Sequence, residues 1–177
     1  MLQIFTPKIK DVDQLKTFAT LSFRQAYPSD SDQDVTNMNK YCSQNFKTAL
    51  FEADLVDKRC IYFVLKEKEN WLGYAKLRWD RSHPDLGNEK NIELQRLYVL
   101  DSAKGKGVGS DLTKHCIDFA KTKGYHWLWL VVYNKNKKAI RFYQKFGFKK
   151  FGVALFQFGD TMEKDDAMRL ELVNSNE

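Results

Sequence analysis

The sequence has few of the residues that cross-link small proteins or bind metals. Its 177 residues include three cysteines, three histidines and three prolines. The cysteines stand far apart at positions 42, 60 and 116, and the histidines at 83, 115 and 126, so neither a metal-ligand spacing nor a disulfide framework is present. We interpret the cysteines as small buried residues of a protein kept in a reducing compartment.

Long apolar runs are also missing. No stretch approaches the 18 residues of a membrane span, and residues 1–13 alternate charge with hydrophobic residues, unlike a signal peptide. We therefore expect a cytoplasmic protein without a membrane partner. No linker, repeat or low-complexity tract divides the chain, which predicts a single domain over residues 1–177.

Aromatic side chains and positive charge are plentiful. Aromatic residues make up 14% of the chain, and 29 Lys and Arg against 23 Asp and Glu give a net charge of +6. Such a surplus attracts polyanions without distinguishing nucleic acid from a phosphorylated cofactor. The lysines are spread through the chain, most aromatic residues recur at core spacing, and no helix-turn-helix or RNA-binding signature is present. We expect no nucleic-acid partner.

Hydrophobic periodicity divides the chain into helices and strands. Spacings of three and four predict helices over residues 15–26, 31–42, 48–56, 107–123 and 137–146. Aromatic and β-branched runs predict strands over 2–9, 60–65, 72–80, 92–100, 127–133, 148–158 and 167–173. A strand–helix–strand–helix core flanked by hairpins makes this a mixed α/β (α+β) protein.

The most informative segment lies between a predicted strand and a predicted helix. It reads Lys104-Gly105-Lys106-Gly107-Val108-Gly109-Ser110. Glycines at alternate positions let the backbone approach a ligand closely, and the following helix presents free N–H groups and a positive dipole, which suit a diphosphate. The segment is not a Walker loop, and a dinucleotide fingerprint requires glycine where Ser110 stands. An ordinary glycine-rich turn is the alternative interpretation.

A second informative block lies one strand downstream. It contains Asn136, Ala139, Ile140, Phe142, Tyr143, Lys145, Gly147 and Phe148. With the strand at 93–99 and the glycine loop, this block resembles the GNAT superfamily of N-acetyltransferases. The signature loop of that family is Arg/Gln-x-x-Gly-x-Gly/Ala, and here Lys104, Gly107 and Gly109 take its defined positions. Residues 156–160 and Asp166-x-Met168 are similar to the tail of bacterial spermidine/spermine N-acetyltransferases of the PaiA type.

The resemblance implies a GNAT fold and a bound acetyl-CoA. The fold is a mixed, mostly antiparallel central sheet flanked by helices, in which the parallel strands at 92–99 and 127–133 splay apart. Pantetheine would lie in the gap and the diphosphate on the amides of the glycine loop, with no metal. The residues so assigned to the cofactor are Leu97, Tyr98, Val99, Lys104, Gly105, Lys106, Gly107, Val108, Gly109, Ser110, Asn136, Ala139 and Lys145.

The resemblance also implies direct acetyl transfer to a primary amine in a ternary complex. Glu93 takes the family-like position of the base that removes the amine proton. Its alternative role is a solvent-facing or salt-bridged strand residue. Tyr143 takes the position of the acid that protonates the departing thiolate. Its alternative role is core packing, since it shares a helical stripe with other apolar residues.

The expected acceptor is a small-molecule amine, with a polyamine such as spermidine or spermine favoured. A protein N-terminus, a lysine and an aminoglycoside remain alternatives, as does a regulator that binds acetyl-CoA without turnover. Asp30, Asp32 and Asp34 could supply negative charge at the acceptor mouth, although a turn and helix cap is their more ordinary role. Family members are often dimers, so the resemblance also allows a homodimer.

Overall fold

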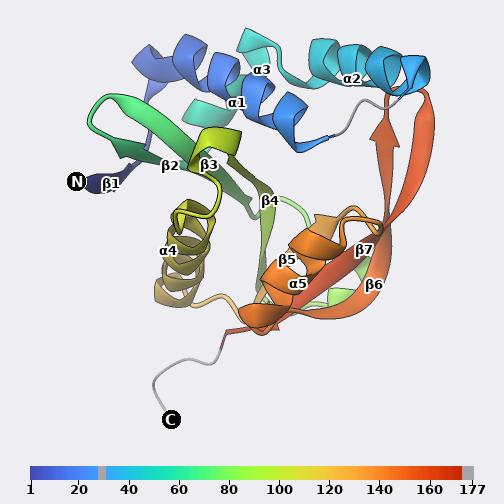
Figure 1. Cartoon of the computed structure of the whole chain (residues 1–177). Helices are drawn as coiled ribbons and strands as arrows, with labels where there is room; N and C mark the ends of the chain where they lie inside the picture. The colour runs from blue at the N-terminus through green and yellow to red at the C-terminus, as the bar shows by residue number, and fades with distance from the viewer. Residues whose placement is uncertain (28–30, 173–177) are drawn as a thin grey trace.

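A twisted sheet of seven strands organises the computed structural model, which describes residues 1–27 and 31–172 (Figure 1). The strand order is β1-β2-β3-β4-β5-β7-β6, and β4 and β5 form the parallel pair among antiparallel neighbours. The predicted mixed, mostly antiparallel sheet is thereby confirmed. The strands are β1 (Leu2–Phe5), β2 (Cys60–Glu67), β3 (Asn70–Arg78), β4 (Asn91–Val99), β5 (Trp127–Val132), β6 (Lys149–Phe158) and β7 (Thr161–Glu171).

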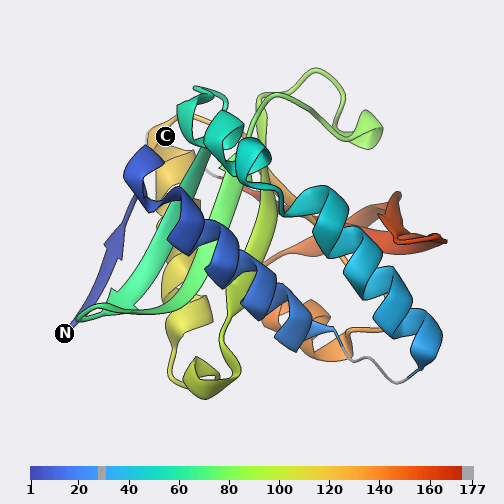
Figure 2. The same ribbon diagram turned by 90° about the horizontal axis from the view of Figure 1, so that it is seen from above.

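Helices cover both faces of the sheet. Figure 2 shows α1 and α2 lying across one face, with α3 beside them, whereas α4 and α5 pack on the other. Short 3-10 turns cover Ile9–Asp11 (η1), Pro84–Leu86 (η2) and Asp101–Ala103 (η3). The helices are α1 (Val12–Ala26), α2 (Asp32–Asn45), α3 (Thr48–Val56), α4 (Val108–Thr122) and α5 (Lys137–Lys145). None of these helices is long and apolar enough to cross a membrane.

Two apolar clusters fix the helices to the sheet. On one face, the predicted stripe of α4 is buried against β3, β4 and β5, with Leu112 and Cys116 fully covered. On the other face, Leu15 and Phe23 of α1 pack against Tyr74 of β3. Burying apolar area is worth roughly 25 cal/mol per Å², so these two clusters hold the layers together.

Two strands differ from the sequence prediction. β1 ends at Phe5, well before residue 9, because Pro7 has no N–H group with which to continue the ladder. β7 begins at Thr161, six residues before the predicted start, because a turn at Gly159 brings the polar residues 161–166 into register with β6. These residues alternate too weakly in hydropathy to reveal a strand. Residue 173, the predicted strand end, lies outside the described residues.

The parallel pair β4–β5 is short. Asn91–Glu93 pairs with Trp127–Trp129, and beyond these residues β4 pairs with β3 and β5 with β7. The two strands therefore separate toward their C-terminal ends, as predicted. This separation leaves an opening in the middle of the sheet.

Candidate active site

A cavity of about 800 Å³ occupies the opening between β4 and β5. Every predicted cofactor-binding residue except Lys106 and Lys145 lines it, and so does Tyr143. Lys106 is exposed in the glycine loop, and Lys145 is exposed at the far end of α5. The structure thus gathers residues from β4, the loop before α4 and the start of α5 around one space.

The glycine loop forms a cradle of backbone N–H groups. Gly105 and Gly107 have φ angles of 79° and 84°, a left-handed conformation that other residues adopt only with strain. Gly107 is the N-cap of α4, and within the described chain no acceptor bonds to the N–H groups of residues 107–110. Lys104 forms an ion pair with Asp101 beside them. Free N–H groups at a helix start, together with its dipole, favour an anionic group such as a phosphate.

The edge of β4 offers a second set of polar groups. The register between β3 and β4 shifts so that Gln95 bulges out of the ladder, and its side-chain Oε1 is buried with no partner in the part of the chain described. From Leu94 to Val99, no strand within residues 1–27 and 31–172 pairs with β4 on the β5 side. An extended ligand bearing amides can add to such an edge as a strand would. The cavity therefore fits a long ligand with phosphate at one end and amides along its length.

Tyr143 faces this cavity from α5. Its ring packs edge-on against Phe142 and Phe148, at centroid distances of 5.3 and 5.7 Å. Its hydroxyl makes no hydrogen bond to any other described residue. Burial raises the pKa of Tyr143 well above its usual range, with lesser contributions from Cys116 and Tyr27. The phenol is therefore protonated at neutral pH, which is the form able to donate a proton.

Asn136 begins α5, as the sequence indicated. Its side-chain Oδ1 accepts a hydrogen bond from the backbone N–H of Ala139 at 3.0 Å. The cap fixes the first turn of α5 at the cavity wall, where both residues lie.

Glu93 lies outside the group of residues around the cavity. It is 3% exposed, and both carboxylate oxygens accept hydrogen bonds from Arg81, at 2.7 Å from Nε and 2.9 Å from Nη2. It stands at the closed end of the splay, where β4 still pairs with β5. The structure thus places Glu93 in a salt bridge and does not bring it beside Tyr143.

Aromatic residues on the α1–α2 side were not predicted as part of the site. Tyr27 lines the cavity and stacks on Phe158 of β6 at 5.5 Å. Tyr41 of α2 packs against Phe156 at 5.5 Å and Phe158 at 6.0 Å. These rings come from segments far apart in the chain, so no local motif could have grouped them.

Two other groups of charged residues lie elsewhere. The guanidinium of Arg96 lies over the rings of Phe46 and Phe51, at 4.7 and 5.6 Å, and so points away from the glycine loop. Asp32 and Asp34 lie exposed in the first turn of α2, where Ser31 accepts a hydrogen bond from the Asp34 N–H. Ser31 is thus the cap, and the Asp34 carboxylate supports it by accepting a hydrogen bond from the Ser31 hydroxyl at 2.7 Å. Asp30 lies outside the described residues.

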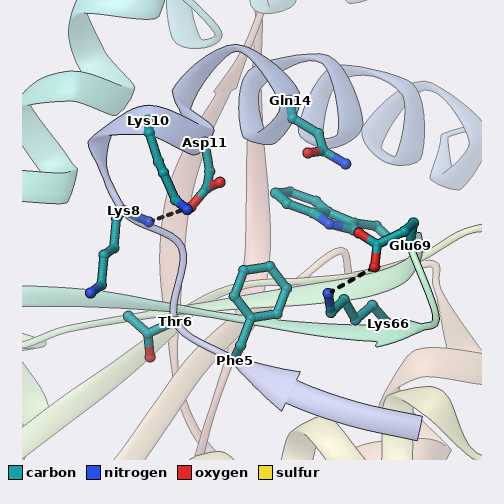
Figure 3. Close-up of a pocket in the computed structure, with 9 residues that line it drawn as sticks. Phe5, Thr6, Lys8, Lys10, Asp11, Gln14, Lys66 and Glu69 are labelled. Carbon is teal, nitrogen blue, oxygen red and sulfur yellow. Dashed lines mark hydrogen bonds and ion pairs between the residues drawn. The ribbon is translucent and has the colours of Figure 1, made fainter. Parts of the chain in front are cut away.

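A second hollow, of about 350 Å³, lies beside β1 at the other end of the sheet (Figure 3). Phe5 and Trp71 form its apolar part, and lysines and acids form its rim. Lys66 pairs with Glu69 at 3.8 Å, and Asp11 accepts a hydrogen bond from the Lys8 N–H at 2.9 Å. Because charges of both signs already meet there, we assign this hollow no ligand.

The chain is similar to known acetyltransferases along most of its length. The model of the acetyltransferase (GNAT) family matches residues 18–148. An uncharacterized N-acetyltransferase of Mycobacterium tuberculosis is 31% identical over 163 residues, which cover 92% of this chain and 99% of the relative.

Solved structures agree in fold. The PaiA N-acetyltransferase of Thermoplasma acidophilum, in complex with coenzyme A, superposes with a TM-score of 0.76 at 19% identity, over 97% of this chain and 99% of that one. Mutant forms of the spermidine/spermine N-acetyltransferase SpeG of Vibrio cholerae superpose with a TM-score of 0.68 at 18% identity, over 97% and 95% of the two chains. At these identities the likeness concerns the fold alone.

Proposed function

Because the chain belongs to the GNAT family of acetyltransferases, we propose that it transfers the acetyl group of acetyl-CoA to a primary amine at the cavity between β4 and β5. One observation carries the proposal: the free N–H groups of residues 107–110 and the unpaired edge of β4 border the same cavity. A diphosphate fits the first feature and the amides of pantetheine fit the second.

Each wall residue has a role in this proposal. The N–H groups of residues 107–110 hold the diphosphate, and Lys104 exchanges its Asp101 partner for phosphate oxygens. The backbone of Leu97–Val99 aligns the pantetheine arm, and Asn136 keeps the start of α5 in place. Acetyl-CoA supplies the acetyl group as a thioester. Tyr143 holds a proton at its hydroxyl, ready for the sulfur that leaves.

We favour a polyamine as the acceptor. This choice draws on the fold shared with proteins named PaiA N-acetyltransferase and spermidine/spermine N-acetyltransferase. The aromatic ring of Tyr27, which lines the cavity, also suits an ammonium group, because cations are attracted to aromatic rings. A protein N-terminus, a lysine and an aminoglycoside are the competing acceptors.

The test is release of the CoA thiol from acetyl-CoA in the presence of a panel of amines. The panel contains spermidine, spermine, diaminoalkanes, aminoglycosides and lysine peptides. We expect turnover with the polyamines. Turnover confined to another amine would keep the acetyl transfer and discard the polyamine. Calorimetry with acetyl-CoA completes the test, since binding without turnover would indicate a non-catalytic regulator and no binding would refute the proposed site.

A further inference from the structure

Two carboxylates of β7 have no cation beside them. Glu163 and Asp165 form no ion pair within 4 Å among residues 1–27 and 31–172, whereas the adjacent Asp166 pairs with Lys150. Side chains alternate along a strand, so Glu163 and Asp165 share one face. Met168 belongs to the opposite face and packs in the α4 cluster. The two carboxylates therefore face the α1–α2 side, toward which the β6–β7 hairpin reaches in Figure 1.

Asp165 is the more buried of the pair. It is 3% exposed, and from the residues that the structure describes it receives a single hydrogen bond, from the backbone N–H of Asn134 to Oδ1 at 3.3 Å. A carboxylate has about four acceptor positions, so most of its capacity is unused. Pairing between β5 and β7 ends with Val132 and Asp166, which leaves Asp165 just beyond the end of β5. Burying a carboxylate without an ion pair costs solvation free energy, and a carboxylate contributes little to apolar packing in return. A structural role therefore does not account for Asp165.

Asp165 does not itself line the cavity, but it lies next to residues that do. Its partner Asn134 stands between Tyr133 and Lys135, both of which line the cavity. Tyr27 lines it as well, and the charge of Asp165 is one of the causes, after burial, that raise the pKa of Tyr27. Tyr27 in turn contributes to the raised pKa of Tyr143. A single tyrosine thus lies within electrostatic reach of both the buried carboxylate and the predicted acid.

The surroundings of Asp165 suit a cationic amine. Phe156 pairs across the hairpin with Glu163 and packs against Tyr41, so aromatic rings and carboxylates share this face. The charges that act on Asp165 are those of Glu163 and Asp166 on the same strand. Lys135 lies in the loop between β5 and α5, with its ammonium 6.0 Å from the ring of Tyr133. On the α1–α2 side, the titratable groups are Tyr27, which follows α1, and Tyr41 of α2.

We propose that Asp165 accepts the proton that the acceptor's ammonium group must lose. The inference rests on the proposed acetyl transfer and adds its base. An aliphatic amine with a pKa of about 10 arrives as an ammonium ion and reacts only when neutral. One N–H proton passes to a carboxylate oxygen of Asp165. The nitrogen lone pair then forms the C–N bond to the acetyl carbon while the C–S bond breaks.

The remaining protons balance through solvent. Tyr143 gives its proton to the leaving sulfur and regains one from solvent, which takes up the second proton lost by the nitrogen. Asp165 releases its proton to solvent before the next turnover. The net change is ammonium plus thioester to amide, thiol and one proton.

Asp165 is better placed for this step than Glu93. Both oxygens of Glu93 accept hydrogen bonds from Arg81, so this carboxylate is already engaged in a bidentate ion pair. At Asp165, burial raises the pKa of the carboxyl group, the Asn134 N–H opposes this rise, and the charges of Glu163 and Asp166 add to it. The raised pKa of Asp165 lies closer to the pKa of the ammonium group, which makes proton transfer to the carboxylate easier.

The test is Asp165→Asn, which keeps an oxygen for the Asn134 N–H but cannot take a proton. At pH 7 we expect kcat/KM for the acceptor to fall about 10²-fold, the lower range for one acid–base group, with the affinity for acetyl-CoA unchanged. The loss should shrink as the pH approaches 10, where about half of the amine is already in the free form. Asp166→Asn is the matched control, because it changes the adjacent carboxylate on the opposite face, and its kcat/KM should stay within about twofold.

Each outcome supports or refutes Asp165 as the proton acceptor. A wild-type rate in Asp165→Asn at pH 7, or a loss that persists unchanged to pH 10, would overturn it. A wild-type protein that turns over no amine would overturn the proposed function itself, and the assignment with it. If Asp165→Asn no longer binds acetyl-CoA, Asp165→Ala with added formate replaces it: restored turnover supports the assignment, and absence of restoration in a folded variant refutes it.

Discussion

The two walls of the cavity are built from different parts of the chain. The wall formed by β4, the glycine loop and α5 comes from two nearly continuous segments and presents mainly backbone groups. The opposite wall presents side chains: Tyr27, which directly follows α1, lines the cavity, and Tyr41 of α2, Phe156 of β6 and Asp165 of β7 belong to the side chains around it. A wall of backbone groups requires glycines and a helix start at fixed spacing, so its sequence is constrained. A wall of side chains can be altered by substituting one residue at a time.

This difference assigns the two substrates to different walls: the first wall binds the cofactor, and the second selects the amine. The backbone groups would serve any member that uses the same cofactor, since they depend on local geometry. The side chains of the other wall decide which amine is accepted, because their charge and shape come from several elements. The two walls should therefore respond independently to mutation.

The largest expected effect is on the backbone wall. Gly107→Glu places a side chain at a φ of 84° and a negative charge among the N–H groups that we assign to the diphosphate. We expect the affinity for acetyl-CoA, measured by calorimetry, to fall more than about 100-fold, while the protein stays folded, since strain of this kind costs about 1–2 kcal/mol.

Gly87→Glu is the control for strain. Gly87 also has a positive φ, of 62°, in the 79–90 loop, and nothing lies within 4 Å of the position of an added Cβ. It should lower the melting temperature at least as much, because a ψ of −144° puts Gly87 in a region that is essentially restricted to glycine, and it should leave acetyl-CoA binding intact. Equal affinity in both variants would remove the glycine loop from the cofactor site.

The next largest effect is expected at Tyr143, the residue proposed to protonate the leaving sulfur. Tyr143→Phe removes the hydroxyl and keeps the ring between Phe142 and Phe148. We expect kcat to fall about 10²- to 10³-fold, with the affinity for acetyl-CoA within about twofold of wild type. Tyr125→Phe, a buried tyrosine of the same apolar cluster, should leave kcat unchanged. An unaltered rate in Tyr143→Phe would reduce this tyrosine to a packing residue.

A smaller effect is expected at Asn37, which joins α2 to the β6–β7 hairpin beside the side-chain wall. Asn37 of α2 is 2% exposed and bonds the tip of the β6–β7 hairpin, with Nδ2 donating to Thr161 Oγ1 at 2.9 Å and Oδ1 accepting from the Asp160 N–H at 3.0 Å. Asn37→Ala should lower the free energy of unfolding by about 1–3 kcal/mol, because it leaves these groups unpaired. Steady-state kinetics should show KM for the amine raised about threefold to tenfold, a loosening of the wall on the scale of one hydrogen bond, and an unchanged KM for acetyl-CoA.

The control for Asn37→Ala is Asn45→Ala at the other end of α2, where the side chain bonds the Tyr41 carbonyl. It should change neither KM. A rise in KM for both substrates of Asn37→Ala would show that the walls are mechanically coupled and would contradict their independence.

The contrast between the walls also explains which parts of the site could be predicted from the sequence. The glycine loop, the splay of β4 and β5 and the cap at Asn136 follow from local spacing, and each is present in the structure. The salt bridge of Glu93 with Arg81 could not be foreseen, since Arg81 belongs to a loop whose path is set by packing. Asp165 was hidden for a similar reason: its strand looks polar, and only pairing with β6 reveals which face it occupies.

The smallest effect concerns stability and links it to the proposed base. The folded protein raises the pKa of Asp165 above its unfolded value of about 3.9. Between these two values the folded state binds more protons than the unfolded state, so this group makes the protein less stable as the pH rises through that window, and the deficit persists at pH 7. Asp165→Asn removes the ionisation and should therefore raise the melting temperature at pH 7 while reducing activity. Near pH 3.5, where the carboxyl group is protonated in the folded state, the two melting temperatures should converge. A variant that is less stable than wild type at pH 7 would mean that the carboxylate contributes to folding, and the trade-off between stability and proton transfer at this wall would be lost.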